Sequence, residues 1–303
     1  MKDSKGTIRW KKDFSKIVTK KSNTNQNVIF ESVETGKQVL LQECLYNDLL
    51  PQSVKSSPIS SLSGEDNLWI ASSMLNRVSD TTNNIVVIEK EYPSGIISTK
   101  EILRGVLKNP TLNFFDKTSS SDIMNRKFYL DTRSAKLAKI LSQMNSTNQT
   151  FSIIQNSKYD FTSISFREIL EIGSMCQIDN MQELETKEKV RKCTRDSSVK
   201  NVIKLLVDGK IELVQLEEES LVLDKQSILQ NIVTKLNFLE NVDDFLELNS
   251  TIFQFQAPKL IPENLAFPEI CKLMLDMKFP YLITSKRIWT PHDVMEILSK
   301  GVE

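Results

Sequence analysis

One short pattern recurs four times along the chain and constrains the fold more than any other feature. In each copy, an apolar strand-like run turns through one or two polar residues into a helix that opens with an acidic or polar residue and two aliphatic residues. The copies are GIISTKEIL (Gly95 to Leu103), FTSISFREIL (Phe161 to Leu170), SLVLDKQSIL (Ser220 to Leu229) and RIWTPHDVM (Arg287 to Met295). Aligned on Glu101, Glu168, Ser227 and Asp293, they are separated by 67, 59 and 66 residues. The sequence therefore predicts four small repeats and not one large domain.

Each repeat has the same predicted order of elements. An amphipathic helix precedes each turn, because apolar residues spaced at i, i+3, i+4 and i+7 line one helical face. These residues are Leu137, Ile140, Leu141 and Met144; Val199, Val202, Ile203 and Leu206; Ile270, Leu273, Met274 and Met277; and, more loosely, Leu68, Ala71 and Leu75. Strands are predicted between helix and turn at Ile85–Ile88, Ser152–Ile154, Ile211–Leu216 and Tyr281–Ile283, and a short extended piece precedes each helix. The predicted fold class is α+β (mixed α/β), with four β-α-β-β-α repeats.

A single repeat is too small to bury much apolar surface alone, so the repeats must pack together. Their spacings favour one pair formed by the first and second repeats and another formed by the third and fourth. The predicted boundaries are an N-terminal basic extension at 1–45 and repeats at 46–112, 113–180, 181–242 and 243–303.

The composition is that of a soluble globular protein, with 40% hydrophobic and 26% charged residues. No apolar run approaches the ~20 residues that span a bilayer, and the N-terminus carries charges where a secretory signal has its apolar core. We expect a cytoplasmic protein that does not contact membranes.

Several kinds of chemistry are disfavoured. Cys44, Cys176, Cys193 and Cys271 are scattered, which predicts reduced, mostly buried thiols instead of a metal site or disulfides. His292 is the only histidine, which removes Ser–His and Cys–His pairs and multi-histidine metal sites. No glycine-rich phosphate loop is present. We expect a protein that is not an enzyme.

The order of elements and the closing turn, Gly-h-h-Ser/Thr-x-x-Asp with h an aliphatic residue, resemble the CBS domain, named after cystathionine β-synthase. The match is clearest in IVVIEKEYPSGIISTKEILRGVL (Ile85 to Leu107), and the repeats cover about residues 46–301. The resemblance implies a quadruple-CBS protein with two tandem pairs in a disc-like pseudo-dimer and ligand clefts between paired repeats. It also implies a regulator that needs no cofactor, binds AMP, ADP, ATP or S-adenosylmethionine, and signals to a partner protein.

The turn carries the ligand-binding residues that the resemblance implies. In the family, its Asp holds the ribose hydroxyls and its Ser or Thr helps to hold the phosphate or ribose, beside a helix N-terminus that favours an anion. The corresponding pairs are Thr290 with Asp293, Ser98 with Glu101, Ser165 with Glu168 and, in reversed order, Asp224 with Ser227. Glu is one methylene longer than Asp, so only the fourth repeat keeps the full pattern.

The same residues have a second interpretation. Ser-x-x-Glu and Thr-x-x-Asp are also helix-capping sequences, whose hydroxyl and carboxylate satisfy free backbone N–H groups. His292 is placed either to touch a ligand phosphate or, as we expect, in solvent at a helix start. Ile59, Leu130 and Leu260 stand where the family flanks an adenine, but apolar residues at such positions are expected in the core.

A basic arm supports an alternative function. Residues 1–21 hold eight Lys or Arg against two Asp, a net charge of +6. Such an arm binds phosphate backbones or is a solvated terminus, and Arg9, Trp10, Lys11 and Lys12 include an aromatic residue able to stack on bases. The alternative is an RNA- or ribosome-binding scaffold with degenerate ligand clefts. Both a monomer and a homodimer are compatible with the sequence.

Overall fold

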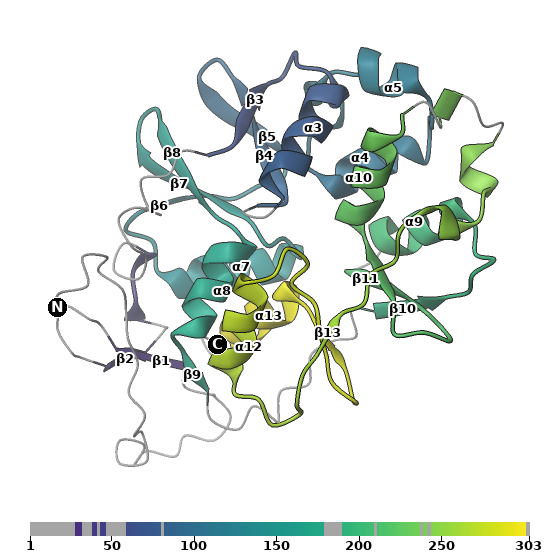
Figure 1. Cartoon of the computed structure of the whole chain (residues 1–303). Coiled ribbons are helices and arrows are strands. Elements are labelled where there is room, and N and C mark those ends of the chain that lie inside the picture. The colour runs from purple at the N-terminus through teal and green to yellow at the C-terminus, as the bar shows by residue number, and fades with distance from the viewer. Residues whose placement is uncertain are drawn as a thin grey trace. The chain divides into compact units, whose positions relative to one another are not determined.

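A computed structural model describes residues 28–31, 38–40, 43–46, 59–79, 82–178, 190–208, 211–236, 239–240 and 244–300 (Figure 1). The chain divides into two compact units. Unit 1 comprises Met1–Pro58, Tyr129–Thr186 and Leu260–Glu303, and unit 2 comprises Ile59–Phe128 and Lys187–Lys259. Each unit thus contains two of the four repeats.

Unit 2 contains the first and third repeats. The first repeat consists of β3 (Ser61–Ser63), α3 (Leu68–Val78), β4 (Asn84–Glu89), β5 (Tyr92–Ser98) and α4 (Thr99–Val106), followed by α5 (Leu112–Lys117) and α6 (Ser120–Ile123). The third consists of β10 (Val190–Cys193), α9 (Val199–Asp208), β11 (Leu213–Leu216), β12 (Val222–Asp224) and α10 (Lys225–Thr234), followed by the 3-10 helices η3 (Phe245–Glu247) and η4 (Ser250–Ile252). In each three-stranded sheet, the central strand is parallel to the first strand and antiparallel to the last.

Unit 1 contains the second and fourth repeats. The second consists of β6 (Leu130–Thr132), α7 (Leu137–Thr147), β7 (Ser152–Ser157), β8 (Asp160–Ile164) and α8 (Phe166–Ser174). The fourth consists of β13 (Lys259–Leu260), α12 (Phe267–Leu275), β14 (Leu282–Ile283), β15 (Ile288–Trp289) and α13 (Pro291–Lys300). A further sheet joins β1 (Val28–Glu31) to β2 (Gln38–Leu40) and to β9 (Gln177–Ile178). The predicted β-α-β-β-α order is therefore confirmed in all four repeats.

The amphipathic helices bury the faces that the sequence predicts. The four apolar positions of α7 and the four of α9 are all 0% exposed, because they form one stripe on a 3.6-residue period. In α12, Ile270 and Met274 are 2% and 1% exposed, whereas Leu273 is half-buried and Met277, also half-buried, lies beyond the end of the helix. Burying one such aliphatic side chain contributes about 1.5–3 kcal/mol. These stripes hold the repeats together.

The two cores are shared by alternate repeats. In unit 2, α10 packs against α3 and α4, and α4 packs against α9; in unit 1, α8 packs against α12 and α13, and α13 packs against α7 (Figure 1). The two units agree in number with the two predicted pairs. Their membership differs from the prediction, because each core joins alternate repeats and not neighbouring ones. The spacing between repeats sets only how long each repeat is, and the shapes of the helix faces decide which helices meet.

Candidate functional site

The fourth turn joins β15 to α13 and carries the Thr290–Asp293 pair. The backbone N–H of Thr290 donates to Asp293 Oδ2 at 2.7 Å, and Thr290 Oγ1 donates to the same oxygen at 2.8 Å. In return, the N–H of Asp293 donates to Thr290 Oγ1 at 3.3 Å. Pro291 begins the helix, where its missing N–H costs nothing. The two side chains therefore form a reciprocal helix cap, and the two residues as a whole are 0% and 2% exposed.

Arg287 lies against the other oxygen of the Asp293 carboxylate. Its Nη2 is 3.6 Å from Asp293 Oδ1, and its guanidinium carbon lies 3.7 Å from the centroid of the Trp289 ring. Burial lowers the pKa of Arg287, while Asp293 and Glu296 act in the opposite direction. The Arg287 side chain is 28% exposed, compared with 3% for Asp293. The fourth turn thus contains a buried carboxylate, that of Asp293, beside the partly exposed guanidinium of Arg287.

The first two turns are capping boxes. The N–H of Ser98 donates to Glu101 Oε2 at 3.0 Å, and the Ser98 hydroxyl donates to the same oxygen. The N–H of Ser165 donates to Glu168 Oε2 at 2.7 Å, again with a hydroxyl hydrogen bond to that oxygen. The capping interpretation is confirmed for both pairs, while their predicted role in ligand binding stays a prediction.

In the third turn the acidic residue and the hydroxyl residue stand in the reverse order, as the sequence indicates. Asp224 is the N-cap of α10, and its Oδ1 accepts a hydrogen bond of 2.7 Å from the N–H of Ser227. The carboxylate here precedes the helix instead of lying in its first turn. It therefore stands at a different place in the turn from Asp293.

Two expectations about single residues are wrong. His292 is 2% exposed and is not a solvated histidine at a helix start, because α13 packs against both α7 and α8. Leu260 is 76% exposed and is not a core residue, since its strand lies at the edge of the sheet β13-β14-β15. Ile59 and Leu130 are half-buried.

The cysteines are buried, as the sequence predicts for most of them. The side chains concerned are those of Cys44, Cys176, Cys193 and Cys271. Burial raises the pKa of the Cys176 and Cys271 thiols well above their ordinary value. Within the described residues, no group of three or more His, Cys, Asp or Glu side chains is arranged to hold a metal ion.

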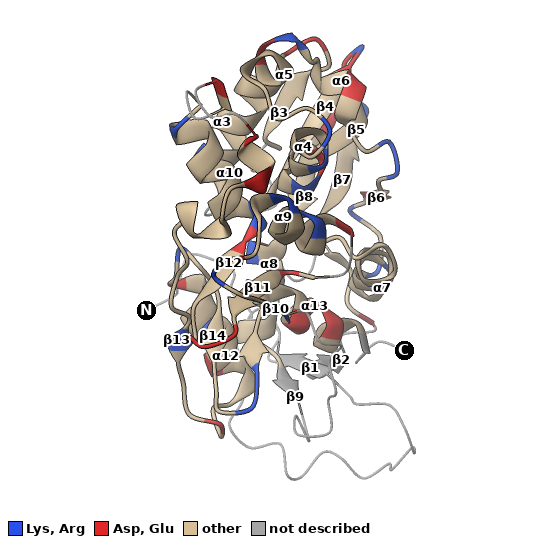
Figure 2. Cartoon of the chain, turned by 90° about the vertical axis from the view of Figure 1, so that its right-hand side faces the viewer, with Lys and Arg blue, Asp and Glu red and all other residues tan. Residues whose placement is uncertain are grey.

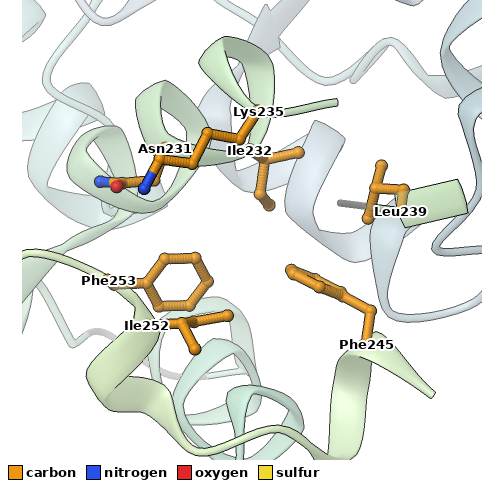
Figure 3. Close-up of a pocket in the computed structure, with 7 residues that line it drawn as sticks. All are labelled: Asn231, Ile232, Lys235, Leu239, Phe245, Ile252 and Phe253. Carbon is orange, nitrogen blue, oxygen red and sulfur yellow. The ribbon is translucent and has the colours of Figure 1, made fainter. Parts of the chain in front are cut away.

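A small cavity with a mostly apolar lining lies in the third repeat (Figure 3). Its volume is about 20 Å³, which is close to the space that one water molecule occupies. It is lined by Asn231, Ile232, Lys235, Leu239, Phe245, Ile252 and Phe253. Phe245 and Phe253 meet edge to face, with ring centroids 6.4 Å apart. The sequence pattern gave no indication of this cavity, because it forms where α10 meets the irregular segment around η3 and η4.

Charged residues of both signs are distributed along the described chain. Figure 2 shows basic and acidic residues interspersed on the elements of both units. Arg9, Trp10, Lys11 and Lys12 lie outside the described residues, and the comparisons below give no support to RNA or ribosome binding. In the part of the chain that the structure describes, no helix has the length and apolar character needed to cross a bilayer.

The fold is similar to that of known proteins, although no family model and no curated protein matches the sequence. A Methanocaldococcus jannaschii protein described as a candidate archaeal homologue of γ-AMPK aligns over 81% of this chain and 98% of its own, with 13% identity and a TM-score of 0.66. A candidate signal-transduction protein with CBS domains from Burkholderia ambifaria covers 47% of this chain and 95% of its own, with 13% identity and a TM-score of 0.36. A Pyrobaculum aerophilum CBS-domain protein complexed with AMP covers 42% and 90%, with 15% identity and a TM-score of 0.34. With its four β-α-β-β-α repeats, the chain has the fold of a quadruple CBS-domain protein.

Proposed function

We propose that this chain is a non-catalytic regulatory module that binds an adenosine-containing ligand at the fourth turn and signals that binding to a partner protein. The ligand class is AMP, ADP, ATP or S-adenosylmethionine. One observation carries the proposal: Asp293 forms the helix cap through Oδ2, while Oδ1 faces a cation outside the cap. The carboxylate therefore keeps one oxygen directed away from the helix.

The fourth repeat offers a group for each part of such a ligand. Asp293 Oδ1 is suited to accept hydrogen bonds from the vicinal ribose hydroxyls. The N-terminus of α13 favours an anionic phosphate. Leu260 offers an exposed apolar side chain for an adenine, on the same sheet as the strand that leads into the turn. All of these groups belong to a single repeat.

Because the fourth turn is buried, binding of a ligand there is coupled to the packing of helix α13. Because Asp293 is 2% exposed, a ligand reaches it only after a covering side chain moves, and Arg287 is the more exposed member of the pair. Helix α13 begins at this turn and packs against α7 and α8 of the second repeat. A ligand that binds one arrangement of these helices better than another shifts their equilibrium, and a partner protein reads that shift. The fold similarity to a protein described as a γ-AMPK homologue supports a regulatory role.

Isothermal titration of the full chain with AMP, ADP, ATP and S-adenosylmethionine tests the proposal. At least one ligand should bind, and Asp293→Asn and Thr290→Ala should each weaken its binding about 10-fold or more, because one charge-assisted hydrogen bond is worth roughly 1.5–3 kcal/mol. Thr111→Ala removes the helix cap of α5 in unit 2 and serves as the matched control, which should bind normally. Absence of binding by all four ligands contradicts the proposal, and so does equal weakening by Thr111→Ala.

A further inference from the structure

Arg287 is the one charged residue among the four repeats at its position, which lies next to the proposed site. The other three repeats have Gly95, Thr162 and Leu221 there. At Gly95 a Cβ atom would lie 2.5 Å from Met124 Sδ, so that turn has no room for a side chain. The fourth turn instead accommodates a full guanidinium.

The backbone and side chain of Arg287 are both held. Its N–H donates to Thr284 Oγ1 at 3.2 Å, and its carbonyl oxygen accepts a hydrogen bond of 2.9 Å from the N–H of Thr284. The guanidinium stacks on Trp289 at 3.7 Å. This stacking fixes the plane of the guanidinium and leaves its edges to form hydrogen bonds.

One edge of the guanidinium lacks a hydrogen bond. Nη2 of Arg287 is buried, and no hydrogen-bond acceptor is found for it among the described residues. Asp293 Oδ1 lies 3.6 Å away, which is beyond hydrogen-bonding distance. Native structures rarely leave a buried donor unsatisfied, and such a donor calls for a bound acceptor. For a planar cation, the best acceptor is a phosphate or carboxylate oxygen.

We propose that Arg287 makes the fourth site selective for adenine nucleotides that carry phosphate, over adenosine and S-adenosylmethionine. This inference rests on the proposed function. In the complex, the ribose hydroxyls donate hydrogen bonds to Asp293 Oδ1. The Arg287 guanidinium is thereby released from that carboxylate and binds the phosphate. Adenosine has no anionic group for the guanidinium. S-adenosylmethionine carries a cationic sulfonium at the ribose 5′ carbon, where AMP carries its phosphate, and its carboxylate lies farther along the chain beside an ammonium group.

The test is isothermal titration of the full chain with AMP, adenosine and S-adenosylmethionine. In the wild type, AMP should bind at least about 10-fold more tightly than either of the other two ligands. Arg287→Ala and Arg287→Gln should both reduce AMP binding to the level of adenosine and leave adenosine binding unchanged or stronger. Arg287→Lys should retain part of the selectivity. Lys286→Ala is the matched control, because Lys286 is an exposed cation that pairs with Glu263 at 2.8 Å, and it should change nothing.

The outcomes separate the two proposals. If no ligand binds, the proposed function fails and the selectivity fails with it. If AMP and adenosine bind equally to the wild type, or if AMP selectivity survives in Arg287→Gln, only the role of Arg287 is overturned. Circular dichroism of each variant establishes that it is folded, and the Gln variant keeps the size of the side chain if Ala disturbs the turn.

Discussion

Thr99 Oγ1 donates a hydrogen bond of 2.7 Å to Oε1 of Gln226, which lies 127 residues further along the chain. Nε2 of Gln226 in turn donates to Asn76 Oδ1 at 3.0 Å. A single side chain of α10 is therefore bound by residues from both helices of the first repeat. This is a specific polar link between the first and third repeats, beside a second one in which Arg104 Nη2 donates to the carbonyl oxygen of Val207 at 3.1 Å.

Gln226→Ala should destabilise unit 2 by about 1–2 kcal/mol, because Thr99 Oγ1 loses its acceptor in a buried position. Thr99→Val should cost a similar amount. The double variant should cost less than the sum of the two, with a coupling of about 0.5–1.5 kcal/mol in urea denaturation, as is usual for side chains in contact. Gln230→Ala on the same helix is the matched control and should change stability by under about 0.5 kcal/mol. Strictly additive effects would show that the link contributes nothing.

Gly173→Ala should destabilise unit 1, because α8 approaches α12 closely at this residue. A Cβ there would lie 2.6 Å from Cys271 Sγ and 3.1 Å from Val294 Cγ1. Overpacking of this kind costs about 1–3 kcal/mol. Adding Cys271→Ala removes the sulfur and should recover much of the loss, measured as the urea midpoint of the double variant against each single variant. A double variant less stable than Gly173→Ala alone would contradict the contact.

The elements of the fold were predictable from the sequence, whereas the membership of the two cores was not. Leu137, Ile140 and Met144 repeat on a helical period, and that period alone decides that they share a face. Which helix covers that face depends on the shape of residues more than a hundred positions away, here those of α13. A single sequence does not encode this match in any local pattern.

The candidate site was predicted in part for the same reason. The local pattern of the fourth turn gave both the Thr290–Asp293 cap and its place at a helix start, since both are set by residues three apart. The burial of His292 was missed because it depends on the packing of α13 against the second repeat. Arg287 was not predicted because its guanidinium reaches the turn through a stacking contact with Trp289 and not through a helical period.

Ser165→Ala should cost more stability than Ser98→Ala. Both residues make the same capping box, but Ser165 is 2% exposed while Ser98 is half-buried. Loss of an N-cap hydroxyl costs about 0.5–2 kcal/mol, and a buried position lacks the water that would replace the lost hydrogen bond. We expect a difference of about 0.5–1 kcal/mol between the variants in urea denaturation. A larger loss in Ser98→Ala would show that burial does not determine the cost of losing these caps.

Alkaline pH should destabilise the protein partly through Cys193. Burial, aided by Glu217, raises the pKa of this thiol to about 11, compared with about 8.5 in an unfolded chain. A raised folded pKa contributes stability that is fully present below the unfolded pKa and is lost as pH rises through the folded value, so the loss falls between about pH 8.5 and 11. At pH 10 it amounts to at most about 2 kcal/mol.

Cys193→Ala isolates this contribution. At pH 7 the variant should be less stable than the wild type, because it leaves a small cavity. The difference should shrink between pH 8 and pH 10, since only the wild type loses the stability of the protonated thiol, while the buried Cys176 and Cys271 act equally in both proteins. Urea midpoints measured at pH 7, 8, 9 and 10 follow the difference directly. Parallel curves over this range would mean that the Cys193 thiol ionises no less readily in the folded chain than in the unfolded one.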